Sequence, residues 1–151
     1  MTTNRLRAGV AELEITGQAG LELAAELNPR VSKGVRTPLM AKALVLSSGE
    51  ESLAVVTLDL FGLQGEAANQ LAQAISQRCG LRPEAVMLVC SHTRGAPHTT
   101  PVVGWPGMHE SYVAEVSTRC QRSWNRHRRP SRMPLSAWDT LHFRTWSTTI
   151  A

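Results

Sequence analysis

Residues 86–100 read Val-Met-Leu-Val-Cys-Ser-His-Thr-Arg-Gly-Ala-Pro-His-Thr-Thr, and they are the most informative part of the chain. The first five are mostly apolar, and polar and turn-forming residues follow at once, a pattern typical of a short buried strand. In open α/β sheets, binding sites form beyond the ends of the strands. We therefore expect a strand over 86–90 that delivers polar side chains, including His92 and His98, to the edge of a sheet.

Patterns upstream of this stretch complete an α/β unit. Residues 39–46 and 53–60 are apolar, β-branched runs separated by a polar turn, and they predict adjacent antiparallel strands. Residues 64–79 carry apolar side chains at three- and four-residue spacing and predict a helix that stops at Gly80. The order strand, helix, strand then predicts a crossover between parallel strands. The expected fold class is α/β, a mixed sheet with flanking helices.

The two ends of this unit are less regular. Residues 6–15 alternate in part and slip near Ala11, which predicts a strand with a bulge. Residues 16–33 are punctuated by glycine, asparagine and proline and predict a long loop, of a length that is usually functional. Residues 109–116 have apolar side chains at helical spacing, and we expect that helix to stop at residue 116, since no later stretch keeps a helical or a strand period.

The chain changes character near Ser117. Residues 117–151 hold seven arginines and one acidic residue, whereas the rest of the chain has a net charge of −2 within a total of +4. Three hypotheses explain the change: a natural basic arm, a solvated charged segment, or translation out of frame. We favour the third, because local sequence and fold agree in a selected protein. The predicted division is a partial α/β domain over 1–116 and an irregular, disordered or out-of-frame tail over 117–151.

Cysteine usage and hydropathy limit the compartment and the partners. Cys79, Cys90 and Cys120 are an odd number without Cys-x-x-Cys spacing, so we expect buried free thiols. No apolar run reaches the length of a membrane span, and the first seven residues lack the apolar core of a signal peptide. These features predict a soluble, cytoplasmic protein. Because the body of the chain is not basic, nucleic acid is not an expected partner of that body.

Several short motifs occur in an order that resembles a known family. They are Ala8-Gly9-Val10-Ala11, Gly34-Val35, the run from Pro38 to Leu46, Leu58-Asp59-Leu60 and Cys90-Ser91-His92-Thr93. Over residues 7–116 they resemble the amino-terminal part of neutral/alkaline non-lysosomal ceramidases. The resemblance implies an incomplete part of a larger catalytic domain, and for the whole domain a zinc-dependent amidase that cleaves the lipid amide ceramide into sphingosine and a fatty acid.

The resemblance also implies roles for residues in the loop after 86–90. The family's motif is similar to Thr-His-Thr-His-Ser-Gly-Pro, and its first histidine, a zinc ligand, corresponds to His92. Its second histidine corresponds to Arg94, a permanent cation, which alters both metal affinity and substrate contacts. His98 is a candidate additional ligand. The family's other ligands, a His, a Glu and a Tyr, and its active-site serine come from later segments, so we expect weak or no zinc binding and no amidase turnover here.

Each candidate residue also has a purely structural interpretation. His92 is alternatively a hydrogen-bonded structural residue at a strand end. Arg94 and His98 could together bind an anionic group, and the simpler interpretation is solvated loop charge. Three further residues, Asp59, Arg94 and Trp105, are candidates for the substrate side of the site. In the structural interpretation Asp59 caps the nearby turn, Arg94 is a solvated loop charge, and Trp105 packs under its loop instead of lining a lipid pocket.

The alternative function belongs to a different class. In it the α/β body is a small non-catalytic module, and the arginine-rich segment 117–151 binds nucleic acid or an acidic partner. Salt-dependent binding that disappears when 117–151 is deleted would favour this module. Amide hydrolysis that is lost on His92→Ala would favour an enzyme.

Overall fold

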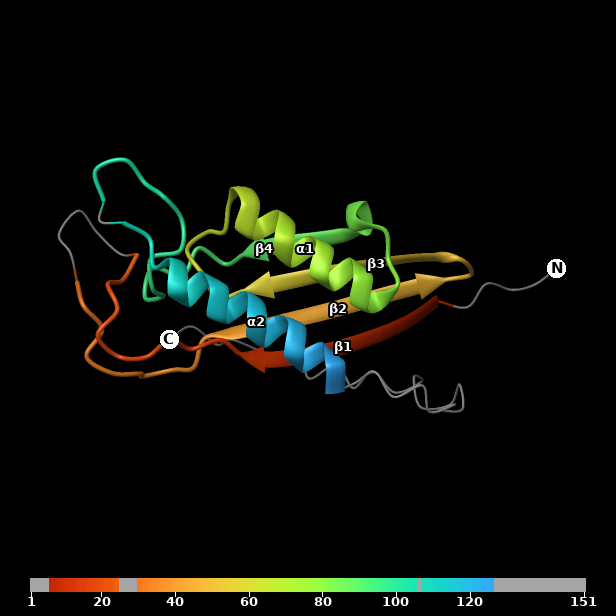
Figure 1. Ribbon diagram of the computed structural model, residues 1–151. Coiled ribbons are helices and arrows are strands. Elements are labelled where there is room, and N and C mark those ends of the chain that lie inside the picture. Colours follow the sequence, from red (N-terminus) through yellow and green to blue (C-terminus); the bar gives the residue numbers. More distant parts are fainter. Residues whose placement is uncertain (1–5, 25–29, 106, 127–151) are drawn as a thin grey trace, which may run out of the picture.

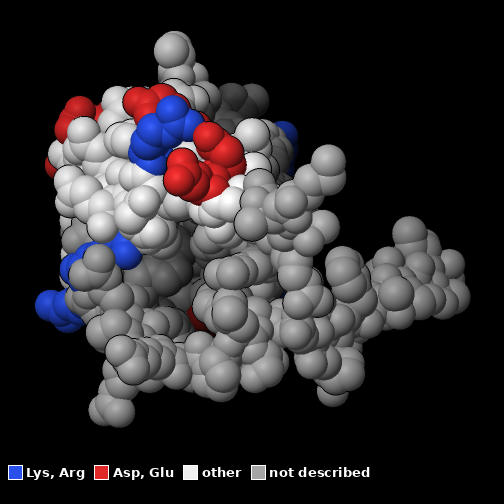
Figure 2. Space-filling model, turned by 90° about the vertical axis from the view of Figure 1, so that its right-hand side faces the viewer, with Lys and Arg blue, Asp and Glu red and all other residues white. Residues whose placement is uncertain are grey.

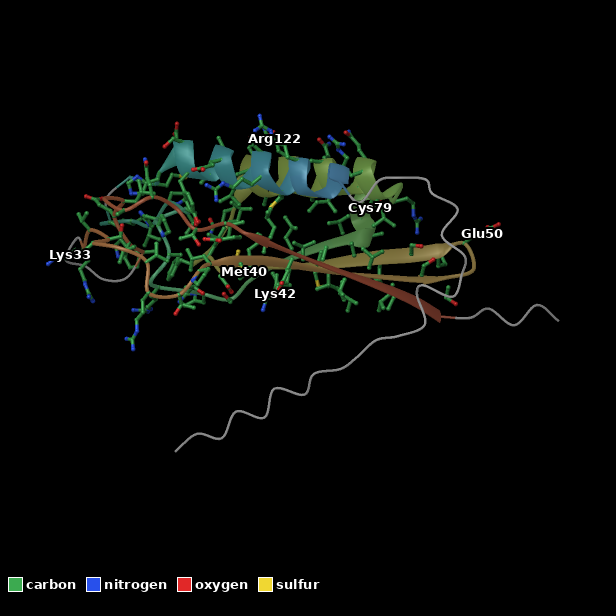
Figure 3. All side chains as sticks on the ribbon, turned by 90° about the horizontal axis from the view of Figure 1, so that it is seen from below. Lys33, Met40, Lys42, Glu50, Cys79 and Arg122 are labelled. Carbon is green, nitrogen blue, oxygen red and sulfur yellow. The ribbon has the colours of Figure 1, made fainter. Side chains whose placement is uncertain are left out.

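A computed structural model of the protein describes residues 6–24, 30–105 and 107–126. In chain order its elements are β1 (Leu6–Glu14), β2 (Met40–Ser48), β3 (Glu51–Leu58), α1 (Gly65–Cys79), the single 3₁₀ turn η1 (Pro83–Ala85), β4 (Val86–Cys90) and α2 (Glu110–Arg126). The strands form one mixed sheet in the order β1-β2-β3-β4 (Figure 1). Both helices lie on the same face of this sheet (Figure 3). The predicted α/β class, with a mixed sheet and flanking helices, is confirmed.

β2 and β3 form the expected antiparallel hairpin. Ser48 pairs with Glu51, so only Gly49 and Glu50 make the turn, and Gly49 has a φ of 61° that glycine adopts without steric cost. At this end of the sheet Glu51 lies 3.6 Å from Arg82, and acidic and basic side chains are mixed there (Figure 2). Exposed pairs of this kind contribute little to stability. The described residues at this end therefore carry charges of both signs.

β3 and β4 are parallel neighbours joined through α1, as the sequence predicts. α1 ends at Gly80, which has a φ of 66° and donates its N–H to the carbonyl of Ser76. That left-handed cap satisfies one carbonyl of the last turn. The helix buries Leu71 and Ile75 in the core. The crossover thus places β4 and its loop beside the end of β3.

β1 does not contain the predicted bulge. It pairs with β2 without interruption from Leu6 opposite Ser48 to Glu14 opposite Met40. The bulge prediction is wrong because apolar residues of this edge strand lie on both faces of the sheet, so the change of parity is not a slip in register. Ala11 packs against the core, whereas Val10 is 71% exposed on the opposite face.

The long loop predicted after β1 is present in the described residues. It is tied back on itself and onto the loop after β4 by isolated bridges that pair Glu22 with Val31 and Leu23 with Pro97. Tyr112 of α2 adds a bond from its hydroxyl to the carbonyl of Ile15, with a length of 2.7 Å. These contacts join the beginning of the loop to segments that lie far away in the sequence.

α2 runs further than the sequence predicts. We expected it to stop at residue 116, but it continues to Arg126, so the predicted end is wrong. Tyr112, Val116 and Cys120 follow one another at four-residue spacing, and each is at most 2% exposed. The helical period therefore persists for a further turn into the arginine-rich segment, where polar neighbours hide it. Residues 127–151 lie outside the described part of the chain, and the division at residue 116 and the out-of-frame origin stay predictions.

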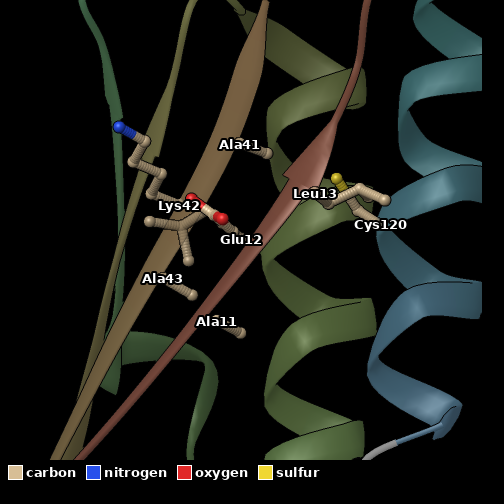
Figure 4. A pocket seen from close by; sticks show the side chains of 8 residues that line it. Ala11, Glu12, Leu13, Ala41, Lys42, Ala43 and Cys120 are labelled. Atoms are coloured by element: carbon tan, nitrogen blue, oxygen red, sulfur yellow. The ribbon is translucent and has the colours of Figure 1, made fainter.

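The core lies between the two helices and the sheet face that they cover. Strand register places Ala43 and Val56 in one row and Ala41 and Leu58 in the next, all directed at the helices. A gap of about 20 Å³ remains where these small alanines meet Cys120 of α2 (Figure 4). That volume is near the minimum for one water molecule. The surface of the gap is almost entirely apolar, although Glu12 and Lys42 are among the residues that line it.

The cysteine prediction holds in part. None of the three thiols forms a disulfide in the structure, but only Cys120 is buried, while Cys79 and Cys90 are partly exposed because they lie at the ends of their elements.

Across the described ranges, no helix combines the length and the apolar character that a membrane span requires.

Cys120 is expected to react slowly as a nucleophile. Burial raises the pKa of its thiol to about 11, so at pH 8 only on the order of 0.1% is thiolate, the reactive form. We expect maleimide alkylation of Cys120 at pH 8 to be at least about tenfold slower in the folded chain than in urea. Peptide mass spectrometry over a time course measures this. Equal rates in the two conditions would contradict the packing of α2 on the sheet.

Candidate site at the end of the sheet

The loop after β4 carries the candidate site and is fixed to the end of the neighbouring strand. The backbone N–H groups of Ser91 and Thr93 donate hydrogen bonds of 3.0 Å to the carbonyls of Leu58 and Leu60. Parallel pairing thus continues briefly beyond the strands. His92 lies between the two anchored residues and is the one non-glycine residue with a positive φ, 57°, among those described.

The left-handed backbone conformation of His92 is of a kind that is common at functional sites. Its side chain is exposed, and its ring centroid lies 4.2 Å from that of Phe61, which follows β3. A left-handed backbone in a non-glycine residue costs on the order of 1 kcal/mol and is concentrated at binding and catalytic sites. The end of β4 therefore presents the imidazole outward at the expected edge of the sheet.

His98 is placed differently from His92. It is 1% exposed, its N–H donates to the carbonyl of Glu22, and its own carbonyl accepts from the N–H of His109. Its ring centroid lies 5.3 Å from that of Trp105. Within the described residues its Nε2 atom has no hydrogen-bond partner. His98 is thus an interior residue with one unsatisfied polar atom.

The described residues do not assemble a zinc site by themselves. The ring of His92 contacts Phe61, the ring of His98 contacts Trp105, and Phe61 and Trp105 contact each other. His109 uses its Nε2 to accept the N–H of Glu22. Across the described ranges, no three His, Cys, Asp or Glu side chains are grouped so as to hold a metal ion. Zinc requires three or four such ligands.

Asp59 ties three segments together at the base of the site. Its carboxylate accepts a hydrogen bond of 2.9 Å from the N–H of Met40 and one of 3.2 Å from the hydroxyl of Ser91. Its own N–H donates to the carbonyl of Met40. These partners are residues of β2 and of the loop after β4, not the turn around Gly62 that the sequence suggested. Both carboxylate oxygens already have partners.

The two other substrate-side candidates differ in exposure. Arg94 is exposed, two residues beyond His92. Trp105 is partly buried, with its ring 5.4 Å from that of Phe61 and 5.3 Å from that of His98. These contacts agree with the packing interpretation of Trp105. They do not test a contact with a lipid.

A hollow adjoins this loop, and the sequence did not predict it. The loop between β1 and β2 and the loop after β4 together enclose about 320 Å³, with Arg36 and Thr93 in the wall. A second hollow of about 570 Å³ shares Gly34 and Gly95 with the first. Cavities of this size accommodate small-molecule ligands. The one sequence signal was the unusual length of the loop over 16–33.

Phe61 was also missed, although its position carried a signal. It follows Leu58-Asp59-Leu60, at the end of the strand that we predicted beside 86–90. Because the carboxyl ends of parallel strands meet at one edge of a sheet, residues after both strands become neighbours. Phe61 is therefore the residue that supports the ring of His92.

The fold matches that of known hydrolases. Scans of protein-family models and of curated proteins give no match. Among solved structures, neutral ceramidase from Pseudomonas aeruginosa matches 82% of this chain with a TM-score of 0.66 and 23% identity. This chain has a ceramidase-like fold. A ceramidase complexed with C2 also matches 82% of the chain, with a TM-score of 0.63 and 23% identity.

The match with the ceramidases is partial in length. The chain spans 21% of the length of each of the two. The resemblance inferred from the order of short motifs is thus confirmed for the fold, and the chain corresponds to only part of the larger chains that it matches.

The left-handed backbone of His92 predicts how substitutions at this position change the free energy of unfolding. Glycine adopts a φ of 57° freely, whereas alanine does not, and both substitutions remove the ring that contacts Phe61. We expect His92→Gly to be about 1 kcal/mol more stable than His92→Ala. Urea denaturation followed by circular dichroism measures the difference. An alanine variant as stable as the glycine variant would contradict a left-handed His92.

Proposed function

We propose that this chain is part of a ceramidase-like, zinc-dependent amide hydrolase, to which it contributes a strand and one metal ligand, His92. The observation that carries the proposal is the placement of His92. It is exposed and has a left-handed backbone directly after β4. The sequence resemblance, which the structure does not test at this residue, implies that His92 corresponds to the first histidine of the family's motif. The substrate class in this proposal is a lipid amide of the ceramide type.

The chain alone is expected to be inactive in this proposal. Zinc-dependent hydrolases fix the ion with three or more protein ligands and keep one position open. The described residues offer one exposed histidine at the loop, and the neighbouring Asp59 and His109 already have hydrogen-bond partners. In this proposal the remaining ligands come from the part of a ceramidase-like domain that lies outside the region similar to this chain.

Arg94 is the clearest departure from the family's motif. A guanidinium is a permanent cation with donors only, so it cannot replace an imidazole that accepts a proton or binds a metal. We propose that Arg94 lowers activity even in a complete domain. Arg94→His then restores the second histidine of the motif, while Ser91 and Thr93 keep their backbone hydrogen bonds to Leu58 and Leu60.

A chimera tests the proposal. Residues 6–126 of this chain replace the matching region of the Pseudomonas ceramidase, and ceramide hydrolysis is measured for four proteins: the chimera, its Arg94→His variant, and that variant with either His92→Ala or His109→Gln. We expect Arg94→His to raise activity and His92→Ala to lower it by about 100-fold or more, whereas His109→Gln keeps most of it. A folded Arg94→His chimera that is equally active with His92→Ala would contradict the proposal.

A further inference from the structure

The face of the sheet that carries no helix is apolar across all four strands. Register places Val10, Leu44, Val55 and Met87 in one continuous row on this face. Val10 is 71% exposed and Met87 is 61% exposed. Figure 3 shows both helices on the opposite side of the sheet. Within the described residues, this apolar row therefore faces outward.

Polar residues bound the row on one side. The next row on this face begins with Glu12 and Lys42, which are direct partners in β1 and β2, and continues with Thr57. The side chain of Lys42 points away from the helices (Figures 3 and 4). Leu53, which is 44% exposed, extends the apolar region on the other side of the row. An apolar centre beside a charged margin is the composition of a protein interface.

The edge of the sheet next to this face is open as well. β4 is the last strand in the sheet order of the described residues, and it is parallel to β3. Parallel strands are nearly always covered on both faces, and an uncovered edge pairs readily with further strands. Met87 and Val89 of β4 are 61% and 39% exposed on the bare face. Among residues 6–24, 30–105 and 107–126, therefore, no element covers this face or pairs with the free edge of β4.

We propose that this open face, defined by Val10, Leu44, Leu53, Val55 and Met87, is the surface on which the rest of a ceramidase-like catalytic domain packs as a second apolar layer. The inference rests on the proposed function. The matched Pseudomonas enzyme has nearly four-fifths of its chain outside the matched region, since the match spans 21% of it. A domain core forms between two layers, so each apolar sheet face needs its own partner.

The observations favour this occupant over a second copy of the chain. Two copies stacked face to face would cover the apolar row but leave the edge of β4 unpaired. In the proposal, the remainder of the catalytic domain both covers the open face and adds strands to the sheet beyond β4. The open face is thus an internal boundary of a larger domain.

The test uses the full 151-residue chain and, as probe, a polypeptide made of the Pseudomonas ceramidase sequence outside the matched region, co-expressed with it. Val10→Lys and Met87→Lys place charges on the open face. Gln77→Lys places the same charge on the exposed side of α1 and serves as the matched control. Thermal melts of each variant alone confirm that it is folded, because exposed lysines cost the isolated sheet little.

We expect the chain to co-purify with the probe, both open-face variants to weaken that binding at least about tenfold, and the control to bind like the parent. Equal loss in all three variants, or no binding of a folded parent chain, would overturn the inference. So would light scattering that shows a discrete dimer of the chain, dissociated by Met87→Lys. The proposed function fails separately, by an unchanged rate of the active chimera on His92→Ala.

Discussion

Tyr112→Ala is expected to lower the free energy of unfolding by about 3–5 kcal/mol, the range for removing a large buried aromatic side chain. Tyr112 is 2% exposed and belongs to the core cluster. It also joins α2 to the end of β1, because its hydroxyl donates a hydrogen bond of 2.7 Å to the carbonyl of Ile15. Since small domains are stable by only about 5–15 kcal/mol, this loss is a large share of the total.

Tyr112→Phe separates the two contributions. It keeps the ring but leaves the carbonyl of Ile15 without this donor, so we expect a loss of about 1–3 kcal/mol. Urea denaturation of both variants measures the difference. Equal losses for alanine and phenylalanine would show that the hydroxyl alone matters and would contradict the packing of the ring.

The same residue predicts a response to alkaline pH. Burial raises the pKa of the Tyr112 phenol above its usual value near 10. The folded chain therefore holds this proton more tightly than the unfolded chain, and the contribution of Tyr112 to stability is lost as the pH rises above 10. Because the chain has a single tyrosine, absorbance of the phenolate reports this directly.

Leu71→Ala is expected to cost about 2–5 kcal/mol, because Leu71 is fully buried between α1 and the sheet. The matched control is Leu53→Ala in β3. Leu53 is 44% exposed on the bare face, and we expect its loss to cost less than about 1 kcal/mol. Urea midpoints followed by far-UV circular dichroism compare the two. A loss at Leu53 equal to that at Leu71 would mean that the helices do not cover the face that the structure assigns to them.

The elements that the sequence predicted well are those set by local signals. The hairpin of β2 and β3 follows from two apolar, β-branched runs around a polar turn, and α1 follows from its helical spacing and from Gly80. β4 was predicted because an apolar run ends abruptly at polar residues. In each case neighbours in the sequence determine the structure, so a single chain is informative.

The errors arise where tertiary context overrides the pattern. β1 is an edge strand with Val10 exposed on the bare face, and a residue on the wrong face imitates a bulge. α2 extends past residue 116 because Cys120 is buried against the sheet, although polar and basic neighbours surround it in the sequence. Cys120 continues the four-residue spacing of Tyr112 and Val116, but one apolar residue among basic and polar ones is too weak a signal to predict the added turns.

From the sequence, only those residues of the site that directly follow a strand could be predicted. His92 is at the expected edge because β4 ends directly before it. The supporting residues come from distant segments: Glu22 and His109 pair across 87 positions, and a side chain at Gly17 would meet Tyr112 at 3.0 Å. No spacing in the sequence encodes such proximity. The interior placement of His98 likewise depends on loops that the sequence does not position.

The most direct test of the central claim is the zinc content of the purified chain. The chain is incubated with zinc, dialysed against zinc-free buffer and analysed by atomic emission, with His92→Ala as the control. We predict well under one zinc ion per chain and no difference between the two proteins, because the described part of the chain offers one exposed histidine at this loop and no group of three ligands. One firmly bound zinc per chain that disappears in His92→Ala would contradict the claim that this chain carries only part of a metal centre.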